Sequence, residues 1–335
     1  MLQKRPSRPD SLDYISMWFD VRKEFGVNDN IYYGSVQKET SEVSWTILRH
    51  QDTDGLGGMA RVLREQGYPC TKLPVTWEKA PLKGWKLWKA IWRGLFSKGP
   101  KKVMWRRVFP DNQVPNQVSW ALFSKEETVA IKKAARRNKV VLPVLIFWAL
   151  NRALGELMLQ PGKKYRWFFP INLRGAIAFG HPERNHASGI EIIGWPEMSP
   201  GDLRQVIKEE TGRGMHWGLW YLAQIGRFIG RSGVRWVYSK LQGSSQFVGS
   251  FSILGELPFK EPGNPPEDPT KSWVACGPGS PSYPVSTGVL LWHGSLSLSL
   301  LLQPNICDDQ SVSDAVLHRW RDILIHYSLG DPGSP

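Results

Sequence analysis

The hydrophobic and polar positions follow two different periods along this chain. Stretches in which β-branched and aromatic residues alternate with polar ones predict strands, and apolar residues that recur every three or four positions predict helices. Strands are expected at 31–37, 43–49, 165–171 and 188–194. Helices are expected at 10–25, 57–67, 124–138 and 143–159, and a helical region is expected from 201 to 241.

Several of these helices carry their own start signals. Asp10 or Ser11 can cap the first helix, the four residues from Ser124 to Glu127 have the form of a capping box, and Pro143 stands at a first-turn position. Two segments interrupt the pattern: 97–118, rich in Pro, Lys and Gly, is the expected connection between two lobes, and the proline-rich 258–283 is expected to be a long loop. A chain of 335 residues with 41% hydrophobic content can bury two ordinary cores, which favours two lobes.

One short motif stands where a predicted strand meets a predicted helix. His50-x-x-x-Asp54-Gly55 follows the strand at 43–49 and precedes the helix at 57–67, so it forms a strand-to-helix turn with Gly55 at the corner. From the His, Asp and Gly frequencies, this spacing would occur by chance only about 0.03 times in such a chain. The motif therefore marks the turn as a candidate catalytic site.

Further motifs follow in a fixed order. Residues 169–174 read Phe-Pro-Ile-Asn-Leu-Arg, which has the form Pro-x-Asn-Leu-Arg, and 184–189 contain an Asn at an expected strand start. With the His-x-x-x-Asp-Gly motif, these residues resemble the CoA-dependent acyltransferase superfamily, which includes chloramphenicol acetyltransferase, peptide-synthetase condensation domains and the wax ester synthase/diacylglycerol acyltransferase group. On this resemblance, 247–257 is the crossing strand, 284–302 the closing hairpin and 310–327 the last helix.

The chain also departs from the superfamily pattern. Many relatives carry two histidines before x-x-x-Asp-Gly, whereas Arg49 stands at the first of these positions here and His50 at the second. Only 49 residues precede His50, so the resemblance implies a shortened N-terminal lobe. It implies an α/β, two-lobed sandwich like that of chloramphenicol acetyltransferase, with the active site at the lobe interface, an N-terminal lobe at 1–110 and a C-terminal lobe at 111–330.

The resemblance also assigns roles to single residues. His50 is the expected general base of a catalytic motif completed by Asp54 and Gly55. In the superfamily the motif Asp pairs with a distant Arg and shapes the turn, which matches Asp54 with Arg174 here. A hydroxyl on the crossing strand, that of Ser250 or Ser252, is the candidate donor to an oxyanion.

The chemistry implied is the transfer of an acyl group from a thioester to a hydroxyl or amine. An imidazole, with an ordinary pKa of about 6.5, is largely neutral near pH 7 and can take the proton of the attacking group. Because the thioester is already activated, no nucleophilic Ser or Cys and no permanently bound cofactor are required. The co-substrate is acyl-CoA or the phosphopantetheine thioester of an acyl carrier protein. No metal site is expected, and His181, His186 and Glu183 lie in a loop without a helical metal spacing.

The net charge of +13 bears on partners rather than on the fold. Residues 79–107 hold ten Lys and Arg and no acidic residue. At 100° per residue, tryptophans fall on one side of a helix and cations beside them, a profile of helices that lie in an anionic membrane surface. The candidate contacts, with a membrane or with an acidic carrier protein, are Trp85, Lys86, Trp88, Lys89, Trp92 and Arg93. The alternative is that this face packs into the core, and the same alternative is stronger for the aromatic stretch at 215–241.

Cysteine content and hydropathy bear on location. Three scattered cysteines, Cys70, Cys276 and Cys307, favour reduced thiols, and neither an N-terminal apolar region nor an apolar run of about 18 residues is found. We therefore expect a cytoplasmic protein, peripheral on the inner face of the membrane.

Two hypotheses compete with an acyltransferase. One is a catalytically silent relative that binds acyl chains or docks partners through its basic surface, and the other is a nucleic-acid binder. The last is ranked lowest, and no nucleic-acid partner is expected, because no nucleic-acid motif accompanies the charge.

Overall fold

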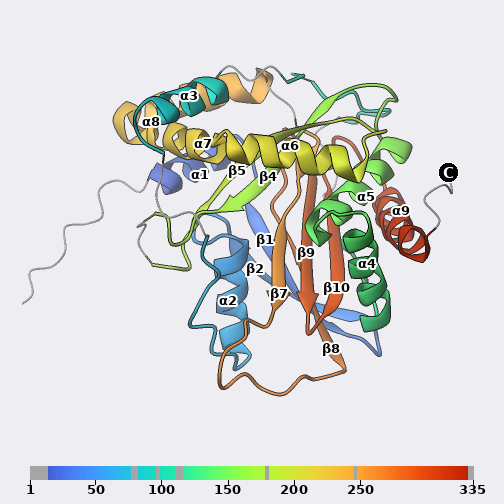
Figure 1. Ribbon diagram of the computed structural model, residues 1–335. Coiled ribbons are helices and arrows are strands. Elements are labelled where there is room, and N and C mark those ends of the chain that lie inside the picture. Colours follow the sequence, from blue (N-terminus) through green and yellow to red (C-terminus); the bar gives the residue numbers. More distant parts are fainter. Residues whose placement is uncertain are drawn as a thin grey trace, which may run out of the picture.

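The computed structural model describes residues 14–76, 82–95, 99–100, 102–110, 116–177, 181–244 and 247–330. The possible caps at Asp10 and Ser11 lie outside these residues. Figure 1 shows a mixed α/β molecule in which the strands run through the centre and helices cover them. The elements before residue 100 are α1 (Tyr14–Glu24), β1 (Asn30–Gln37), β2 (Glu42–Arg49), α2 (Gly55–Glu65) and α3 (Gly84–Leu95).

The rest of the chain supplies most of the strands and the remaining described helices. The strands are β3 (Ser119–Leu122), β4 (Tyr165–Asn172), β5 (Ala187–Gly194), β6 (Gly249–Ser250), β7 (Ile253–Leu257), β8 (Lys271–Cys276), β9 (Val285–Trp292) and β10 (Ser295–Leu302). The helices are α4 (Lys125–Arg137), α5 (Leu142–Leu157), α6 (Pro200–Gly212), α7 (Met215–Gln224), α8 (Gly226–Ser244) and α9 (Gln310–Leu329).

These strands form two sheets. The smaller has the order β2-β1-β8, and the larger runs β3-β10-β9-β6-β4-β5, with β7 also paired to β9. The closing hairpin expected at 284–302 is confirmed as β9 and β10, and its two turn residues, His293 and Gly294, have φ values of 46° and 85°. Positive φ at both central residues is the geometry that matches the twist of a two-residue hairpin. His293 is thus a turn residue.

The long loop expected at 258–283 is wrong in part, because it contains β8. The run Ser272–Cys276 is buried throughout and pairs with β1, whereas the prolines of this segment lie outside the strand. Its partner lies more than 230 positions earlier in the chain, so no local pattern indicated the pairing. The expected crossing strand at 247–257 is also split into β6 and β7, with Phe251 and Ser252 between them.

The expected helical region at 201–241 contains three helices. Gly214, with φ of 71°, separates α6 from α7, and Gly230, with φ of 64°, interrupts α8. The capping box at Ser124 and Glu127 is present at the start of α4, and α5 begins with proline in its first turn. Helix α5 is the central helix of the larger core, where Leu145 and Phe147 are fully buried.

Two main clusters of buried side chains lie on the two sheets. The larger one joins α4, α5 and α9 to the larger sheet, and the smaller one joins β1 and α2 to residues of β7, β8 and β9. Side chains from 257–292 therefore pack in the same core as those of β1 and α2, which come from the N-terminal part of the chain. The position of the lobe boundary, expected near residue 110, stays a prediction.

Within the described residues, no single helix has the length and apolar character needed to cross a membrane. Helices α4 and α5 taken together have the length and composition of a membrane span, but a bend of 97° separates them.

Candidate active site

The turn that carries the His-x-x-x-Asp-Gly motif lies between an edge strand and a buried helix. Strand β2 ends at Arg49, the backbone N–H of His50 donates to the Asp29 carbonyl at 2.8 Å, and α2 begins at Gly55. Asp54 caps this helix by accepting the Gly57 N–H at 2.9 Å. A Cβ on Gly57 would lie 2.1 Å from the Glu183 carbonyl oxygen, so this position must be glycine. The corner residue Gly55 does not adopt positive φ. A Cβ at this position would lie 2.7 Å from the side chain of Leu254, so the close approach of Leu254 favours glycine here.

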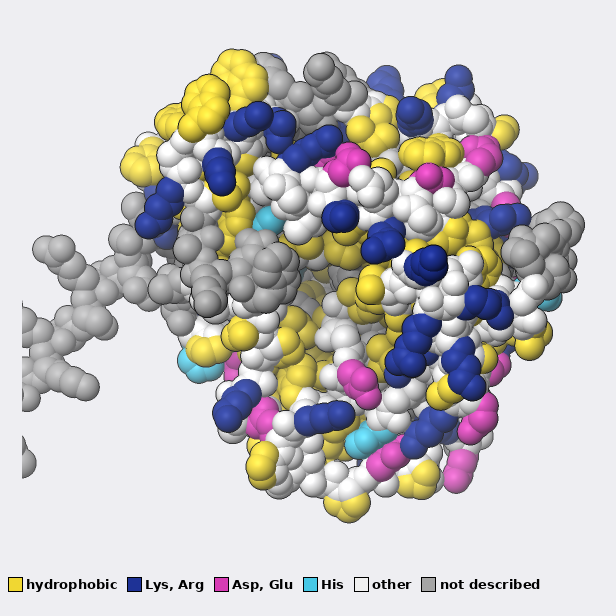
Figure 2. Space-filling model, viewed as in Figure 1, with side chains coloured by type: hydrophobic (Ala, Val, Ile, Leu, Met, Phe, Trp, Pro, Cys, Tyr) yellow, Lys and Arg dark blue, Asp and Glu magenta, His cyan; other side chains and the backbone are white. Residues whose placement is uncertain are grey.

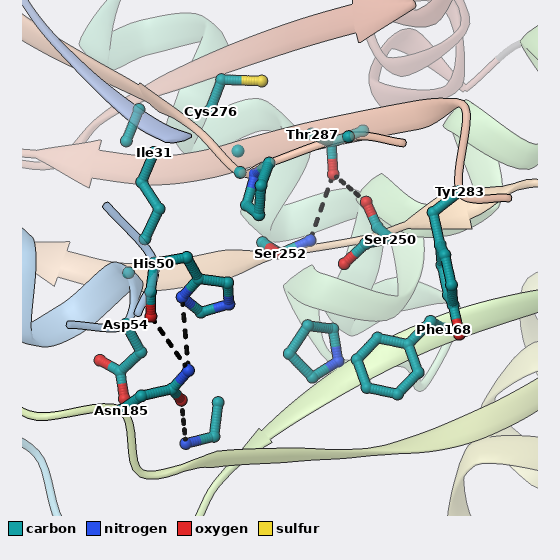
Figure 3. Close-up of a pocket in the computed structure, with 18 of the residues that line it drawn as sticks. Ile31, His50, Asp54, Phe168, Asn185, Ser250, Ser252, Cys276, Tyr283 and Thr287 are labelled. Carbon is teal, nitrogen blue, oxygen red and sulfur yellow. Dashed lines mark hydrogen bonds between the residues drawn. The ribbon is translucent and has the colours of Figure 1, made fainter. Parts of the chain in front are cut away.

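The imidazole of His50 is held by the turn itself. Its Nδ1 lies 2.9 Å from the Thr53 carbonyl oxygen. A carbonyl can only accept, so Nδ1 carries the proton and the lone pair of the neutral ring is on Nε2. The side-chain Nδ2 of Asn185 lies 3.4 Å from both Nδ1 and the carbonyl oxygen of His50, and it donates to the carbonyl because Nδ1 bears its own hydrogen. Figure 3 shows the ring directed into a cavity.

The environment of His50 keeps its ring neutral. Burial lowers the pKa of His50 from its ordinary value of 6.5, the hydrogen bond to the Thr53 carbonyl and the nearby Asp29 and Asp54 oppose this shift, and the Arg22 guanidinium adds to it. A histidine with a lowered pKa is deprotonated at neutral pH and can act as a base.

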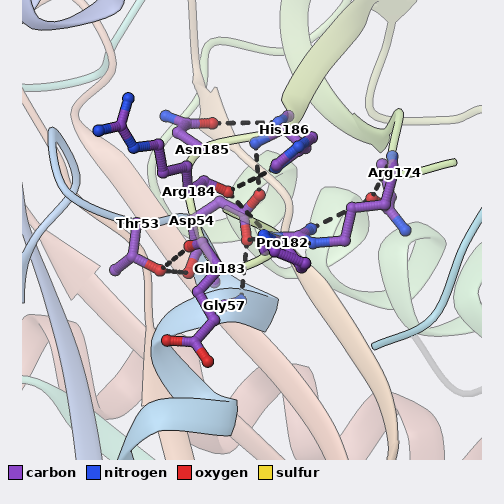
Figure 4. Close-up of polar contacts among 12 residues, drawn as sticks. Thr53, Asp54, Gly57, Arg174, Pro182, Glu183, Arg184, Asn185 and His186 are labelled. Atoms are coloured by element: carbon purple, nitrogen blue, oxygen red, sulfur yellow. Dashed lines mark hydrogen bonds and ion pairs between the residues drawn. The ribbon is translucent and has the colours of Figure 1, made fainter. Parts of the chain in front are cut away.

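Asp54 and Arg174 meet in the buried part of the same turn. Arg174 Nη2 donates to Asp54 Oδ1 at 2.6 Å, and the two side chains are only 4% and 5% exposed. Asp54 Oδ2 accepts the backbone N–H of His186 at 2.9 Å. Arg174 also donates to the carbonyls of Pro182 and Arg184 and to the side chain of Asn172. Figure 4 shows that this network joins the motif turn to the segment between β4 and β5.

A cavity of about 260 Å³ opens beside His50. Asp54 and Gly55 line it from the motif turn, Ser250 and Ser252 line it from the crossing segment, and Asn185 lines it from the start of β5. The hydroxyl of Thr287 donates to the Ser250 carbonyl at 3.1 Å and accepts the Ser252 N–H at 3.2 Å, which fixes the backbone between the two serines. Both candidate oxyanion donors thus share a cavity with the candidate base.

Helix α1 closes one side of this cavity. Phe19 lies with its ring centroid 5.2 Å from that of His50, and Arg22 Nε donates to Asp29 Oδ2 at 2.8 Å. Because Asp29 also accepts the His50 N–H through its backbone carbonyl, the Arg22–Asp29 pair holds α1 against the strand end that carries His50. The sequence motifs gave no signal for Phe19, Arg22, Asp29, Thr53 or Thr287, because each acts through a contact that only the fold brings about.

Among the described residues that line the cavity, the one thiol is that of Cys276, and it is not poised for nucleophilic attack. Cys276 lines the cavity, and burial raises its pKa to about 12, so it stays protonated at neutral pH. In the described part of the chain, no three His, Cys, Asp or Glu side chains are grouped so that they could hold a metal ion.

A second cavity of about 880 Å³ lies on the other side of the ion pair. It is lined by Arg174 and His186, by the segment Thr71–Val75, and by residues of β7 and the segment after it, including Glu256 and Lys260. Asp54 thus faces one cavity and Arg174 the other.

The candidate membrane contacts lie away from this site, on α3. Trp85, Trp88 and Trp92 are 79%, 67% and 65% exposed, and Lys86 and Lys89 are exposed beside them. Arg93 is half-buried. The alternative interpretation, in which this face of α3 packs into the core, does not hold for the three tryptophans. The side chains of Leu95 and Phe96 are not among those that the structure describes.

Comparisons with known proteins agree with this architecture. Neither a protein-family model nor a curated protein sequence matches the chain. Its structure resembles the nonribosomal peptide synthetase FmoA3, with a TM-score of 0.55 and 11% identity over 88% of this chain and 31% of that chain. It also resembles the first condensation domain of the calcium-dependent antibiotic synthetase, solved with a substrate analogue, with a TM-score of 0.50 and 13% identity over 87% and 65% of the two chains.

The chain has the condensation-domain fold. A third match is the epimerization domain from the third module of tyrocidine synthetase B, with a TM-score of 0.52 and 11% identity over 86% of this chain and 69% of that one. The two-lobed sandwich expected from the sequence motifs is therefore confirmed. The chain spans about two thirds of the length of the two separate domains that it resembles.

Replacing Arg174 by alanine should destabilise this condensation-domain fold. The change leaves the buried Asp54 carboxylate without its cation, and breaking a buried pair in this way typically costs about 3–5 kcal/mol. The measurement is urea unfolding of Arg174→Ala beside Arg61→Ala, which removes an exposed partner of Glu65 at 3.8 Å. The control should change by no more than about 0.5 kcal/mol, and equal stability of the two variants would contradict a structural role for Arg174.

His50 should titrate below pH 6.5 because burial lowers its pKa from that value. The ring is then neutral throughout the neutral range and gains its proton only as the pH falls below 6.5. An NMR titration of the imidazole Cε1–H, assigned by its loss in His50→Ala, measures the midpoint. A midpoint above 6.5 would show that the protonated form is the one the fold favours.

Proposed function

We propose that this protein is an acyltransferase that uses His50 as its general base. The observation that carries the proposal is the 2.9 Å hydrogen bond from Nδ1 to the Thr53 carbonyl, which leaves the lone pair of Nε2 for a reactant in the cavity. The condensation-domain fold supports acyl transfer as the type of reaction. The acyl donor is a thioester, either acyl-CoA or an acyl group on the phosphopantetheine of a carrier protein, and the acceptor is a hydroxyl or an amine.

In the proposed reaction, the acceptor attacks the thioester carbonyl directly. As its oxygen or nitrogen forms the new bond, Nε2 of His50 takes its proton, and the carbonyl oxygen becomes an oxyanion. The hydroxyl of Ser250 or Ser252 donates to that oxyanion from the other side of the cavity. Collapse of the intermediate breaks the carbon–sulfur bond, and the leaving thiolate takes the proton back from His50.

The reacting groups of both substrates must lie in the cavity that His50 lines, because Nε2 takes the proton there. One cavity contains His50 and Asp54, and the other contains Arg174 and His186, so the ion pair lies between them. The buried ion pair separates the second cavity from Nε2 of His50, so the second cavity is assigned to no reacting group. Asp54 and Arg174 keep the turn in place and do not act on the substrate in this account.

We further propose that the reaction takes place at an anionic membrane surface on the cytoplasmic side. The exposed tryptophans of α3 and the lysines beside them support this location. An acidic carrier protein is the competing partner for the same helix, because it too would be attracted by Lys86 and Lys89.

Replacing His50 by alanine should lower the rate by about 10²–10⁴-fold, which is the usual contribution of a general base. Thiol release from a panel of acyl-CoA and carrier-bound thioesters, with hydroxyl and amine acceptors present, measures this rate. The matched control is His318→Ala, because His318 lies exposed on α9.

Comparison of lipid extracts from cells that express wild-type protein or His50→Ala then identifies the product. A folded His50→Ala protein with the wild-type rate would contradict the proposal. Wild-type protein without turnover in either assay would favour the catalytically silent alternative.

A further inference from the structure

Helix α3 presents its tryptophans outward and the small Ala90 inward. Ala90 is fully buried, and its carbonyl oxygen would lie 2.5 Å from a Cβ on Gly218 of α7, so the two helices are in close backbone contact there. At 100° per residue, the three tryptophans occupy an arc of about 60° directly opposite Ala90. The cations Lys86, Lys89 and Arg93 occupy one flank of the helix. This arrangement is the reverse of a core-facing amphipathic helix.

Helix α8 also exposes large aromatic side chains. Phe228 is 86% exposed before the break at Gly230, and Trp236 is 65% exposed after it. The opposite side of the helix is the buried one, where Val234 and Tyr238 pack against α1. The core-packing interpretation of the aromatic stretch at 215–241 therefore holds only in part. In α7, Trp217 is buried and Trp220 and Tyr221 are half-buried, whereas α8 exposes Phe228 and Trp236.

Helices α3 and α8 lie at the same end of the molecule (Figure 1). Figure 1 places α3 and α8 together at the upper left, and both helices pack against α7. In Figure 2 the same corner carries a group of hydrophobic side chains with Lys and Arg around it. Exposed hydrophobic side chains scattered singly need no explanation, but a contiguous group with a charged border marks an interaction surface.

The charge of this surface is positive on both helices. Neither α3 nor α8 contains an acidic residue, and α8 exposes Arg227, Arg231 and Arg235. Glu24 of α1 pairs with Arg231 and Arg235, which offsets part of that charge. Lys86 and Lys89 on α3 are exposed, and the whole chain carries +13. A partner for this surface must therefore offer both negative charge and an apolar layer that accepts indole rings.

We infer that α3 and α8 together form one docking surface for an anionic lipid bilayer. Indole and phenyl rings are favourable at the depth of the lipid headgroups, and the surrounding cations contact anionic headgroups at the same depth. An acidic protein would satisfy the cations, but it would leave these large aromatic side chains without a matching apolar layer. The inference rests on the proposed membrane location and names the surface, and it adds α8, for which the sequence pattern favoured core packing.

The placement of α1 connects this surface with the candidate active site. One side of α1 packs on α8 through Val21, and Trp18 donates from Nε1 to the Ala223 carbonyl at 2.8 Å. The other side carries Phe19 and Arg22, which line the cavity beside His50. Helix α1 thus lies between the inner side of α8 and the cavity, so the docking surface and the candidate active site are connected through this helix.

Vesicle co-sedimentation tests the inference without any need for turnover. The full-length protein should sediment with phosphatidylcholine vesicles that contain phosphatidylglycerol, and much less with phosphatidylcholine alone. The triple change Trp85→Ala, Trp88→Ala, Trp92→Ala and the double change Phe228→Ala, Trp236→Ala should each weaken the binding by about tenfold or more. The double change Lys86→Gln, Lys89→Gln should weaken it to a similar extent and reduce its dependence on salt.

Matched controls remove exposed residues elsewhere on the surface. The first is the triple change Val75→Ala, Val108→Ala, Leu329→Ala, because these side chains are as exposed as the tryptophans, and the second is Lys133→Gln with Lys163→Gln. Both controls should bind vesicles like the wild type. Circular dichroism and urea unfolding establish that every variant is folded.

Three results would overturn the inference: no binding to anionic vesicles, wild-type binding by the folded α3 tryptophan variant, or wild-type binding by the folded α8 variant. Binding to an acidic carrier protein instead of vesicles, retained without the tryptophans and lost with salt, would overturn it in favour of carrier docking. Because His50→Ala leaves this surface intact, it should bind vesicles normally. Failure of the catalytic proposal and failure of this one are thus measured separately.

Discussion

The ion pair between Asp54 and Arg174 is the interaction on which the candidate site depends. It joins residues 120 positions apart, and almost none of either side chain is exposed. Two charges in such a place are costly to desolvate, and they are tolerated because each is fully surrounded by hydrogen-bonding partners. Asp54 accepts from Arg174, from the Gly57 N–H and from the His186 N–H, so a single carboxylate fixes the start of α2 and the start of β5 together.

The position of His50 follows from that arrangement. Thr53 immediately precedes Asp54, and its carbonyl can orient the imidazole only because the turn is held still. The segment that Arg174 anchors also brings Asn185 beside the His50 carbonyl, and it brings the Glu183 carbonyl so close to Gly57 that a side chain there is excluded. Arg22 and Asp29 complete the enclosure from α1. The base is therefore oriented by neighbours that do not themselves touch the reacting atoms.

The sequence revealed those features that depend on local pattern. The motif turn and the capping box of α4 each have a short signal in the residues themselves, and each is found in the structure. The hairpin of β9 and β10 was expected from the family resemblance, and it is found as well. Strand β8 and the orienting role of Thr53 could not be predicted in this way, because they arise from pairings between distant segments and from a backbone carbonyl that every residue possesses. The periodicity of α3 indicated two faces but not which of them points inward. The close backbone contact between Ala90 and Gly218 of α7 shows that the face with Ala90 is the inner one.

The central claim is that the neutral ring of His50 presents the lone pair of Nε2 to the cavity. Nitrogen-15 NMR of the imidazole at pH 7.5, assigned by comparison with His50→Ala, reports directly which ring nitrogen is protonated. The hydrogen bond to the Thr53 carbonyl predicts a protonated Nδ1 and an unprotonated Nε2. A proton on Nε2 with none on Nδ1 would contradict the account, because the lone pair would then face a carbonyl and could not receive a proton from an acceptor in the cavity.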